Sequence, residues 1–225
     1  MMPYKHLFPI LLCSVTFSLS AIGQEAQPLK DTVVVAYYNN GMPKELRAYN
    51  EAGKLHGVQL DFNAKGTVSR LQTYRNGQVT GVSKKINGRG NIVGETEYLN
   101  GIRHGYEKAY YQNGDQQSYT EFKMGIKHGD AIWYYRNGNM STKYTYQDGV
   151  LQGEAKTYHK EGAVKAIYTY EDNKREGSYR EFYETGKIKV EGEYDKDQKD
   201  GTWIYYNEEG EVTQKEKYKN GKLKS

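Results

Sequence analysis

Glycine recurs at a fixed interval of 24 residues over most of the chain, and this period restricts the possible folds more than any other feature. The first series comprises Gly57, Gly81, Gly105, Gly129, Gly153, Gly177 and Gly201. A second series keeps the same step at Gly66, Gly90, Gly114, Gly138, Gly162, Gly186 and Gly210. A third is aromatic and comprises Tyr74, Tyr98, Phe122, Tyr146, Tyr170, Tyr194 and Tyr218. A constant period of this length is typical of repeat proteins, in which each unit packs against its neighbours.

The composition favours an aromatic core over an aliphatic one. The chain has 23 Tyr against five Phe and two Trp, and only 36% of its residues are hydrophobic even when Tyr is counted. Aliphatic residues are therefore too few for a thick core that is covered on both sides. Short units that bury aromatic rings against one another remain possible. A formal net charge of +4 spread along 225 residues does not indicate a nucleic-acid partner.

Residues 129–152 show how one unit is built. Residues 130–135 and 140–146 are rich in aromatic and β-branched residues, and we expect both segments to be strands. We expect a tight turn at residues 136–138 and a looser turn that starts at Asp148 and closes at Gly153. Asn-Gly and Asp-Gly pairs between such segments are strong hairpin signals. No helical period of useful length is present. The sequence therefore predicts an all-β fold, an elongated single-layer antiparallel sheet of tandem hairpins.

One further glycine series is interrupted in an informative way. It comprises Gly77, Gly101, Gly125 and Gly149, then Asn173 and Asp197, and then Gly221. After glycine, Asn and Asp are the residues that best tolerate a left-handed backbone. We therefore expect a positive φ at this position of every unit.

The chain divides into three parts. Residues 1–23 have a short basic start, an apolar run and small residues at Ala21 and Gly23, which is the pattern of a secretory signal peptide cleaved after Gly23. An uncleaved N-terminal anchor is the alternative. Residues 24–56 are expected to form a linker and an N-terminal capping hairpin, and residues 57–224 to form seven repeats. We therefore expect a secreted or periplasmic protein, which after cleavage contains no cysteine.

Residues 98–114 show the clearest resemblance to a known family. Gly105 opens the pattern Gly-x-x-x-x-Tyr-x-x-x-Gly, and Tyr98 opens the pattern Tyr-x-Asn-Gly-x-x-x-Gly. These units resemble MORN repeats, and the period is more similar to the bacterial MORN variant that is often labelled a YwqK-family antitoxin. The resemblance covers nearly all of the chain after the signal peptide. It implies hairpin arrays that act as scaffolds or membrane-proximal adaptors, and the antitoxin label implies neutralisation of a partner toxin.

Several residues invite a chemical role but fit it poorly. His56, His104 and His128 each precede a repeat glycine. Two nitrogens on one zinc ion lie within ~4 Å, whereas neighbouring repeats in such a sheet are ~10 Å apart, so we favour solvent-facing turn residues. Residues 195–201 resemble a calcium loop but lack its regular Asp spacing. The sequence therefore predicts no catalytic, metal or cofactor-binding residue.

The leading hypothesis is a non-enzymatic secreted or periplasmic scaffold that binds a protein partner. Most in-register tyrosines are expected to form the repeat core, whereas Trp133 and Trp203 occur less regularly and are the better candidates for contact residues. The alternatives are an antitoxin or immunity protein and an adaptor on a membrane or envelope surface. The sequence indicates no nucleic-acid partner and leaves the oligomeric state open.

Overall fold

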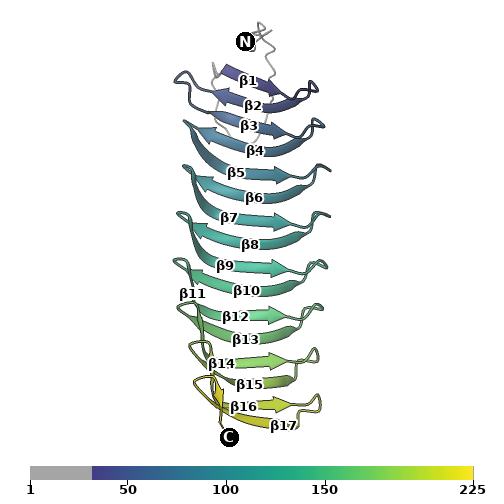
Figure 1. Ribbon diagram of the computed structural model, residues 1–225, viewed down its shortest axis with the longest axis vertical. Coiled ribbons are helices and arrows are strands. Elements are labelled where there is room, and N and C mark those ends of the chain that lie inside the picture. The colour runs from purple at the N-terminus through teal and green to yellow at the C-terminus, as the bar shows by residue number, and fades with distance from the viewer. Residues whose placement is uncertain (1–31, 225) are drawn as a thin grey trace, which may run out of the picture.

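The computed structural model describes residues 32–224, which form one open antiparallel sheet of 18 strands (Figure 1). The expected all-β fold is confirmed, and the described residues contain no helix. The signal peptide predicted at residues 1–23 lies outside the described residues. No helix long and apolar enough to cross a membrane occurs among residues 32–224. The strands are β1 Thr32–Tyr37, β2 Pro43–Tyr49, β3 Gly57–Phe62, β4 Val68–Arg75, β5 Gln78–Ile86, β6 Ile92–Leu99, β7 Ile102–Tyr110, β8 Gln116–Lys123, β9 Ile126–Tyr134, β10 Met140–Gln147, β11 Val150–Leu151, β12 Gly153–Tyr158, β13 Val164–Glu171, β14 Lys174–Phe182, β15 Ile188–Asp195, β16 Gln198–Tyr206, β17 Val212–Lys219 and β18 Lys222–Leu223.

Chain order and spatial order coincide, because strands pair with their neighbours in sequence (Figure 1). The one local exception is β10, which pairs with both β11 and β12. Those two short strands together correspond to a single strand of the other units, interrupted at Gln152. Contacts therefore link adjacent repeats, as a repeat architecture requires.

The two turns of each unit are reversed relative to our expectation. Asp148 and Gly149 form a tight two-residue turn between β10 and β11, with φ of 50° and 87°. Positive φ at both central residues is what a type I′ hairpin turn needs. The predicted tight turn at residues 136–138 is instead part of a five-residue loop. In this loop the Tyr135 amide donates to the Asn139 carbonyl at 2.8 Å, and only Gly138 has positive φ.

The interrupted glycine series confirms the expected left-handed backbone. The φ angle is 66° at Asn173 and 70° at Asp197, close to the 72° of Gly221. The preceding residue of the turn also has positive φ in every repeat, even where it is Met124 or Lys196. The geometry of the turn is therefore kept while its residues vary.

Five of the seven repeat glycines lie inside strands, and Gly57 and Gly153 begin β3 and β12. The turn that starts at Asp148 closes at Val150, which pairs with Gln147, and not at Gly153 as expected. Gly129 lies in the middle of β9, where the pairing with β8 shifts between Thr120 and Phe122. Its φ of 89° fits a β-bulge, at which glycine is favoured. A Cβ atom at this position would collide with the carboxylate of Glu121. The bulge therefore accounts for the strict glycine series.

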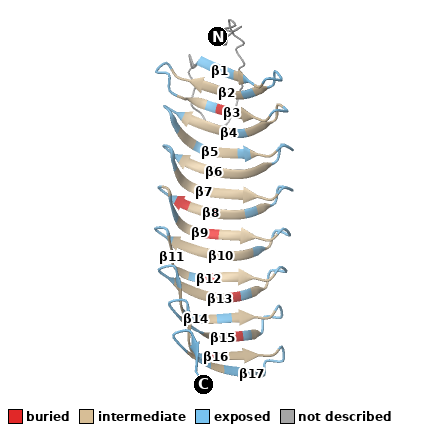
Figure 2. Ribbon diagram, in the orientation of Figure 1, coloured by how far each residue is buried: buried red, intermediate tan, exposed pale blue. Residues whose placement is uncertain are grey.

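The buried residues of the described chain all lie on one face of the sheet, which we call the aromatic face. Residues directly opposite one another in a pair share a face, so the strand register assigns every side chain. In the C-terminal half this face carries Trp133, Tyr144, Tyr146, Tyr168, Tyr170, Tyr179, Tyr194, Trp203, Tyr205 and Tyr218. The strand registers place every buried residue of the described chain on it, namely Gln59, Thr120, Phe122, Ala131, Ala155, Ala166, Val190 and Trp203. Figure 2 shows how few segments of the ribbon are buried.

The opposite face, which we call the charged face, is covered by ion pairs and by hydrogen bonds between tyrosine and glutamate. Lys143 and Asp130 lie 2.7 Å apart on it, and Lys84 lies 3.3 Å from Glu95. The Tyr110 hydroxyl donates to Glu95 at 2.8 Å. The equivalent bond between β16 and β15 joins the Tyr206 hydroxyl to Glu191. This face therefore meets solvent without a second layer of structure.

Aromatic side chains also connect adjacent repeats along the edge formed by the five-residue loops. Tyr111 donates its hydroxyl proton to the carbonyl of Tyr134 in the next repeat at 2.7 Å. Tyr135, His159 and Tyr183 make the same bond to their next repeat. Asn207, in the last repeat, bonds to its own loop instead, through the amide of Glu211. The residue type at the first position of the loop therefore determines whether its side chain forms a hydrogen bond to the next repeat.

Raised tyrosine pKa values predict that the fold weakens at alkaline pH. Burial, with hydrogen bonds to Glu95 and Glu121, raises the pKa of Tyr110 and Tyr119 to about 12. Unfolded tyrosine titrates near ~10. The folded state therefore holds these protons more tightly, so their contribution is complete below pH ~10 and is lost as the pH rises toward about 12. Unfolding monitored by circular dichroism, together with tyrosinate absorbance, measures this.

A matched variant tests the assignment. In Tyr119→Phe the dependence of unfolding free energy on pH across this window should decrease by about one proton equivalent. An unchanged slope, or titration of all tyrosines near ~10 with the sheet intact, would contradict the prediction.

Candidate binding surface

The aromatic rings form a continuous series of contacts from β9 to β17. Trp133 meets Tyr144 with ring centroids 5.7 Å apart, and Tyr144 meets Tyr170 at 5.8 Å. The series continues through Tyr168 and Tyr179 to Trp203 and ends at Tyr218. Most of these pairs are edge-to-face or tilted, the geometries that aromatic rings prefer. The rings thus cover the backbone of several repeats as one surface.

Cations cover the rings of the repeat series in register. Arg103 lies over Phe122 at 4.3 Å, and Lys127 lies over Tyr146 at 4.9 Å. The same spacing recurs where Arg175 lies over Tyr194 at 4.0 Å and Lys199 over Tyr218 at 4.8 Å. These distances are within the range of a cation–π interaction. Of the four rings of the aromatic repeat series in the C-terminal half, Tyr146, Tyr194 and Tyr218 are therefore already partnered by a cation of the same chain.

Leu151 interrupts this series. It stands where its counterparts in the neighbouring repeats are Lys127 and Arg175, so the ring of Tyr170 has no cation at the equivalent place. Leu55 and Val79 occupy the same position near the N-terminus. Within the aromatic half of the sheet, Leu151 alone replaces the cation.

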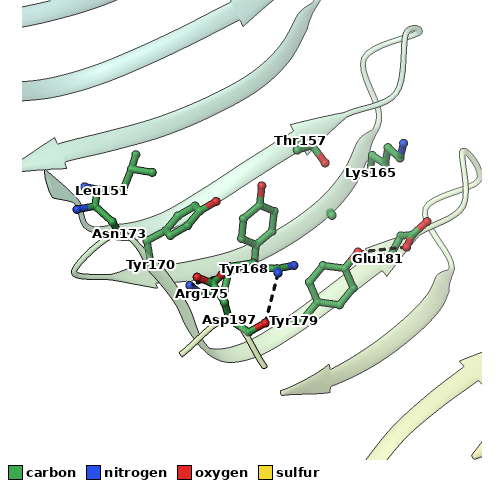
Figure 3. Close-up of a pocket in the computed structure, with 11 residues that line it drawn as sticks. Leu151, Thr157, Lys165, Tyr168, Tyr170, Asn173, Arg175, Tyr179, Glu181 and Asp197 are labelled. Carbon is green, nitrogen blue, oxygen red and sulfur yellow. Dashed lines mark hydrogen bonds and ion pairs between the residues drawn. The ribbon is translucent and has the colours of Figure 1, made fainter. Parts of the chain in front are cut away.

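A hollow of about 610 Å³ opens beside this interruption (Figure 3). The rings of Tyr168, Tyr170 and Tyr179 lie in its centre, with Leu151 at one end and Glu181 at the other. The volume is within the range of ligand pockets, ~300–1,000 Å³. The remaining lining residues are Thr157, Lys165, Ala166, Asn173, Arg175 and Asp197.

The centre of the hollow is neutral and its rim is charged. Burial raises the pKa of the Tyr168 hydroxyl, and hydrogen bonding to Tyr144 acts in the same direction. Burial likewise raises the pKa of Tyr179, whose hydroxyl donates to Glu181 at 3.1 Å. At the rim, Arg175 donates to Asp197 at 2.9 Å, and this bond lowers the pKa of that carboxyl. The hollow therefore suits a group with an apolar or aromatic body and a polar tip.

The two tryptophans that the sequence marked as contact residues have different environments. Trp203 is only 2% exposed, because Tyr179 and Tyr194 pack against its indole and Lys199 covers it. Its expected role in contacting a partner was wrong, since it is part of the core. Trp133 is half-buried on the aromatic face, and its role as a contact residue stays a prediction. Tyr170 was missed because it belongs to the aromatic repeat series, and Tyr168 and Tyr179 were missed because only strand pairing brings them side by side. The available signal was the apolar Leu151 in a cationic series.

Two of the three histidines that precede repeat glycines act as hydrogen-bond acceptors, whereas Nδ1 of His128 has no hydrogen-bond partner among the described residues and lies 3.4 Å from Oδ1 of Asp148. All three are half-buried, and His104 and His128 lie within β7 and β9 rather than in the solvent-facing turns that we expected. Nδ1 of His56 and Nδ1 of His104 each accept from the amide of the positive-φ turn residue 20 positions later, both at 3.4 Å. Gln152, Glu176 and Asp200 accept the equivalent amide in their repeats. The position therefore selects an acceptor rather than a metal ligand. Residues 32–224 contain no group of three or more side chains suited to hold a metal ion.

The carboxylates of the loop-like segment 195–201 are also engaged within the fold. Asp197 pairs with Arg175, and Asp200 accepts from the Asn220 amide at 3.1 Å and pairs with Lys219 at 3.3 Å. These bonds explain why acidic residues occur in this turn without the spacing of a calcium loop.

Comparisons with known proteins identify the repeat. A family model described as MORN repeat variant matches four tandem segments, residues 127–148, 151–172, 175–196 and 199–220. The hollow lies within the second and third of these segments and the adjoining turn. A comparison with curated proteins gave no match.

Among solved structures, the chain is similar to one in "Crystal structure of accessory secretory protein 1,2 and 3 in Streptococcus pneumoniae", with 16% identity and a TM-score of 0.29. The match covers 48% of this chain and 20% of that chain, so it spans about one fifth of the solved chain. A likeness of this degree carries no argument about function.

The fit of Trp203 into the sheet gives a stability prediction. Gly192 lies directly beneath its indole, and a Cβ atom there would collide with the ring. Gly192 does not have positive φ, so the cost of Gly192→Ala arises from overpacking, about 1–3 kcal/mol in the free energy of unfolding. In a Trp133→Phe background the emission of Trp203 should also shift to the red, because the ring becomes more exposed. Chemical denaturation with fluorescence detection measures both effects.

Gly88→Ala is the matched control. Gly88 also lacks a positive φ, and nothing lies within 4 Å of a Cβ atom placed there. Equal stability and equal emission in the two variants would show that Trp203 is not held against Gly192.

Proposed function

We propose that this chain, four of whose units are MORN repeats of the variant type, is an exported non-enzymatic scaffold that binds a protein partner on its aromatic face. A repeat scaffold is what the matched family supports, and that family is generally non-enzymatic. The observation that carries the finer proposal is the hollow beside Leu151, where the cation series is interrupted and tyrosine rings face solvent.

The chemistry of the hollow supports a protein side chain as its occupant. Tyrosines supply a large contact area at a small cost in conformational entropy, and they are enriched at protein interfaces. The rim carries a carboxylate, Glu181, which accepts from Tyr179 and pairs with Lys189 at 3.0 Å, and an amine, Lys165, which can meet an acidic tip. A partner that inserts an aromatic or apolar residue here would complete the burial of rings that the fold leaves half-buried.

A substitution that completes the cation series tests this proposal. In Leu151→Arg the new guanidinium should lie over Tyr170, as Arg175 lies over Tyr194, and should fill one end of the hollow. We expect the fold to be kept and the capture of the partner from envelope extracts to fall by at least about tenfold, the change that ~1.4 kcal/mol produces. Affinity capture with quantitative mass spectrometry measures this.

Val79→Arg is the matched control, because it places the same side chain at the equivalent position of a repeat far from the hollow. Proteins captured by the wild type and by Val79→Arg but lost with Leu151→Arg are the expected partners. Equal capture by both variants, or no capture by the wild type, would exclude the hollow as the binding site. Binding to vesicles without any protein would favour the membrane-adaptor alternative, and rescue of cells from a toxin would favour the antitoxin alternative.

Export is supported by the N-terminal sequence pattern alone. Cleavage after Gly23 would leave a mature chain that begins at Gln24. The intact mass of the protein recovered from the producing cells and their medium should therefore correspond to residues 24–225. A recovered chain that retains residues 1–23 would instead indicate the uncleaved anchor.

A further inference from the structure

The two ends of the sheet differ in how their outer strands are protected. β1 is the N-terminal edge and has the sequence Thr-Val-Val-Val-Ala-Tyr, without charge, Pro or Gly. Its large apolar side chains are exposed, with Val33 at 43%, Val34 at 47%, Val35 at 37% and Tyr37 at 63%. A short uncharged segment of high β-propensity on a sheet edge readily pairs with another strand.

The C-terminal edge carries the protection that β1 lacks. Lys215, Lys217 and Lys219 occur at alternate positions of β17, and β18 pairs with only its last two residues. Lysine on an outer strand is a common means by which proteins prevent edge-to-edge association. Among residues 32–224, edge protection of this kind is therefore found at the C-terminal end alone.

The outer side of β1 has unused backbone hydrogen-bonding groups. β1 pairs with β2 from Thr32 opposite Tyr49 to Tyr37 opposite Pro43, and no other described strand pairs with it (Figure 1). Alternate N–H and C=O groups of an edge strand point away from its one neighbour. An occupant of this edge must therefore be an extended strand.

We propose that β1 pairs antiparallel with β1 of a second copy of the chain, about a two-fold axis through Val34. This register places Val34 opposite its own copy, Val33 opposite Val35, and Thr32 opposite Ala36. Every pair is uncharged, and the central pairs are β-branched, which is favourable for cross-strand contact. Val33 and Val35 share one face and Val34 the other, so the two copies match on both faces.

Pairing of β1 with β17 of a second copy is the competing arrangement. It would place valines beside lysines of the protected edge, and it would leave a free β1 at the end of each assembly. Such a head-to-tail contact continues into filaments, whereas the two-fold contact closes after two chains. Two strands of six residues also bury a smaller area than a standard protein interface, which buries ~1,600 Å². We therefore expect a reversible dimer.

Charge substitution at the axis tests the proposal independently of partner binding. Val34→Lys brings two lysines together on the two-fold axis, so the dissociation constant of the dimer of the mature chain should rise by at least about tenfold. Sedimentation equilibrium over a range of concentrations measures it. Thr213→Lys, on the opposite edge, should leave the dimer unchanged. An equimolar mixture of Val34→Lys and Val34→Glu should restore the dimer, because in a mixed dimer the lysine of one copy lies opposite the glutamate of the other.

These experiments also distinguish loss of the dimer from unfolding of the variant. They further distinguish pairing of β1 between two copies from cover of β1 by another segment of the same chain. An unchanged β-sheet circular dichroism spectrum shows that Val34→Lys keeps the sheet, and restoration of the dimer in the mixture shows that β1 itself is still formed. Hydrogen exchange should protect the β1 amides only at concentrations where the dimer forms. A monomer at all concentrations, protection of β1 in the monomer, filaments in place of dimers, or no restoration in the mixture would each overturn the proposal.

Discussion

A sheet with a single layer has nothing packed on it, so its side chains must cover one another. In this protein the covering is done by rings that lean over small residues. Ala131, Ala155 and Ala166 are buried although no second sheet or helix lies above them. Aromatic rings at neighbouring positions of the same face account for this burial, because a tyrosine side chain extends much further from the sheet than an alanine side chain and can cover it. The alternation of large and small side chains therefore replaces the second layer that most domains use.

This way of covering the backbone explains the composition and the strict phase of the repeat. Each ring must stand beside a small residue of the next strand, so a shift of one residue would move the rings to the charged face. The bulge at each repeat glycine and the type I′ turns close to it together hold the register. Hydrogen bonds along both edges, such as that of Tyr111 to the Tyr134 carbonyl, fix each unit to the next. The period is conserved along the chain because register and burial depend on the same positions.

The sequence was sufficient for the fold class, the repeat length and the left-handed positions at Asn173 and Asp197, because these depend on local backbone preferences. It was not sufficient to distinguish the two turns. Asn137-Gly138 and Asp148-Gly149 carry equivalent dipeptide signals, and the two turns differ only in strand pairing: Gln147 pairs with Val150, whereas Tyr134 pairs with Met140. Trp203 was misjudged for a related reason. Its irregular place in the sequence suggested exposure, but the space that it fills is created by Gly192 on another strand.

The hollow lies where one unit departs from the repeat pattern. A repeat protein is built from positions that are the same in every unit, so a feature that differs between units is not required by the fold. Leu151 can be tolerated because Tyr170 already packs against Tyr144 and Tyr168, and a cation above it is not needed for burial. The ring is then free to contact something outside the chain. The same logic applies to the unprotected edge strand β1. In an array of this kind, departures from the repeat are the places where interaction with other molecules has to be sought.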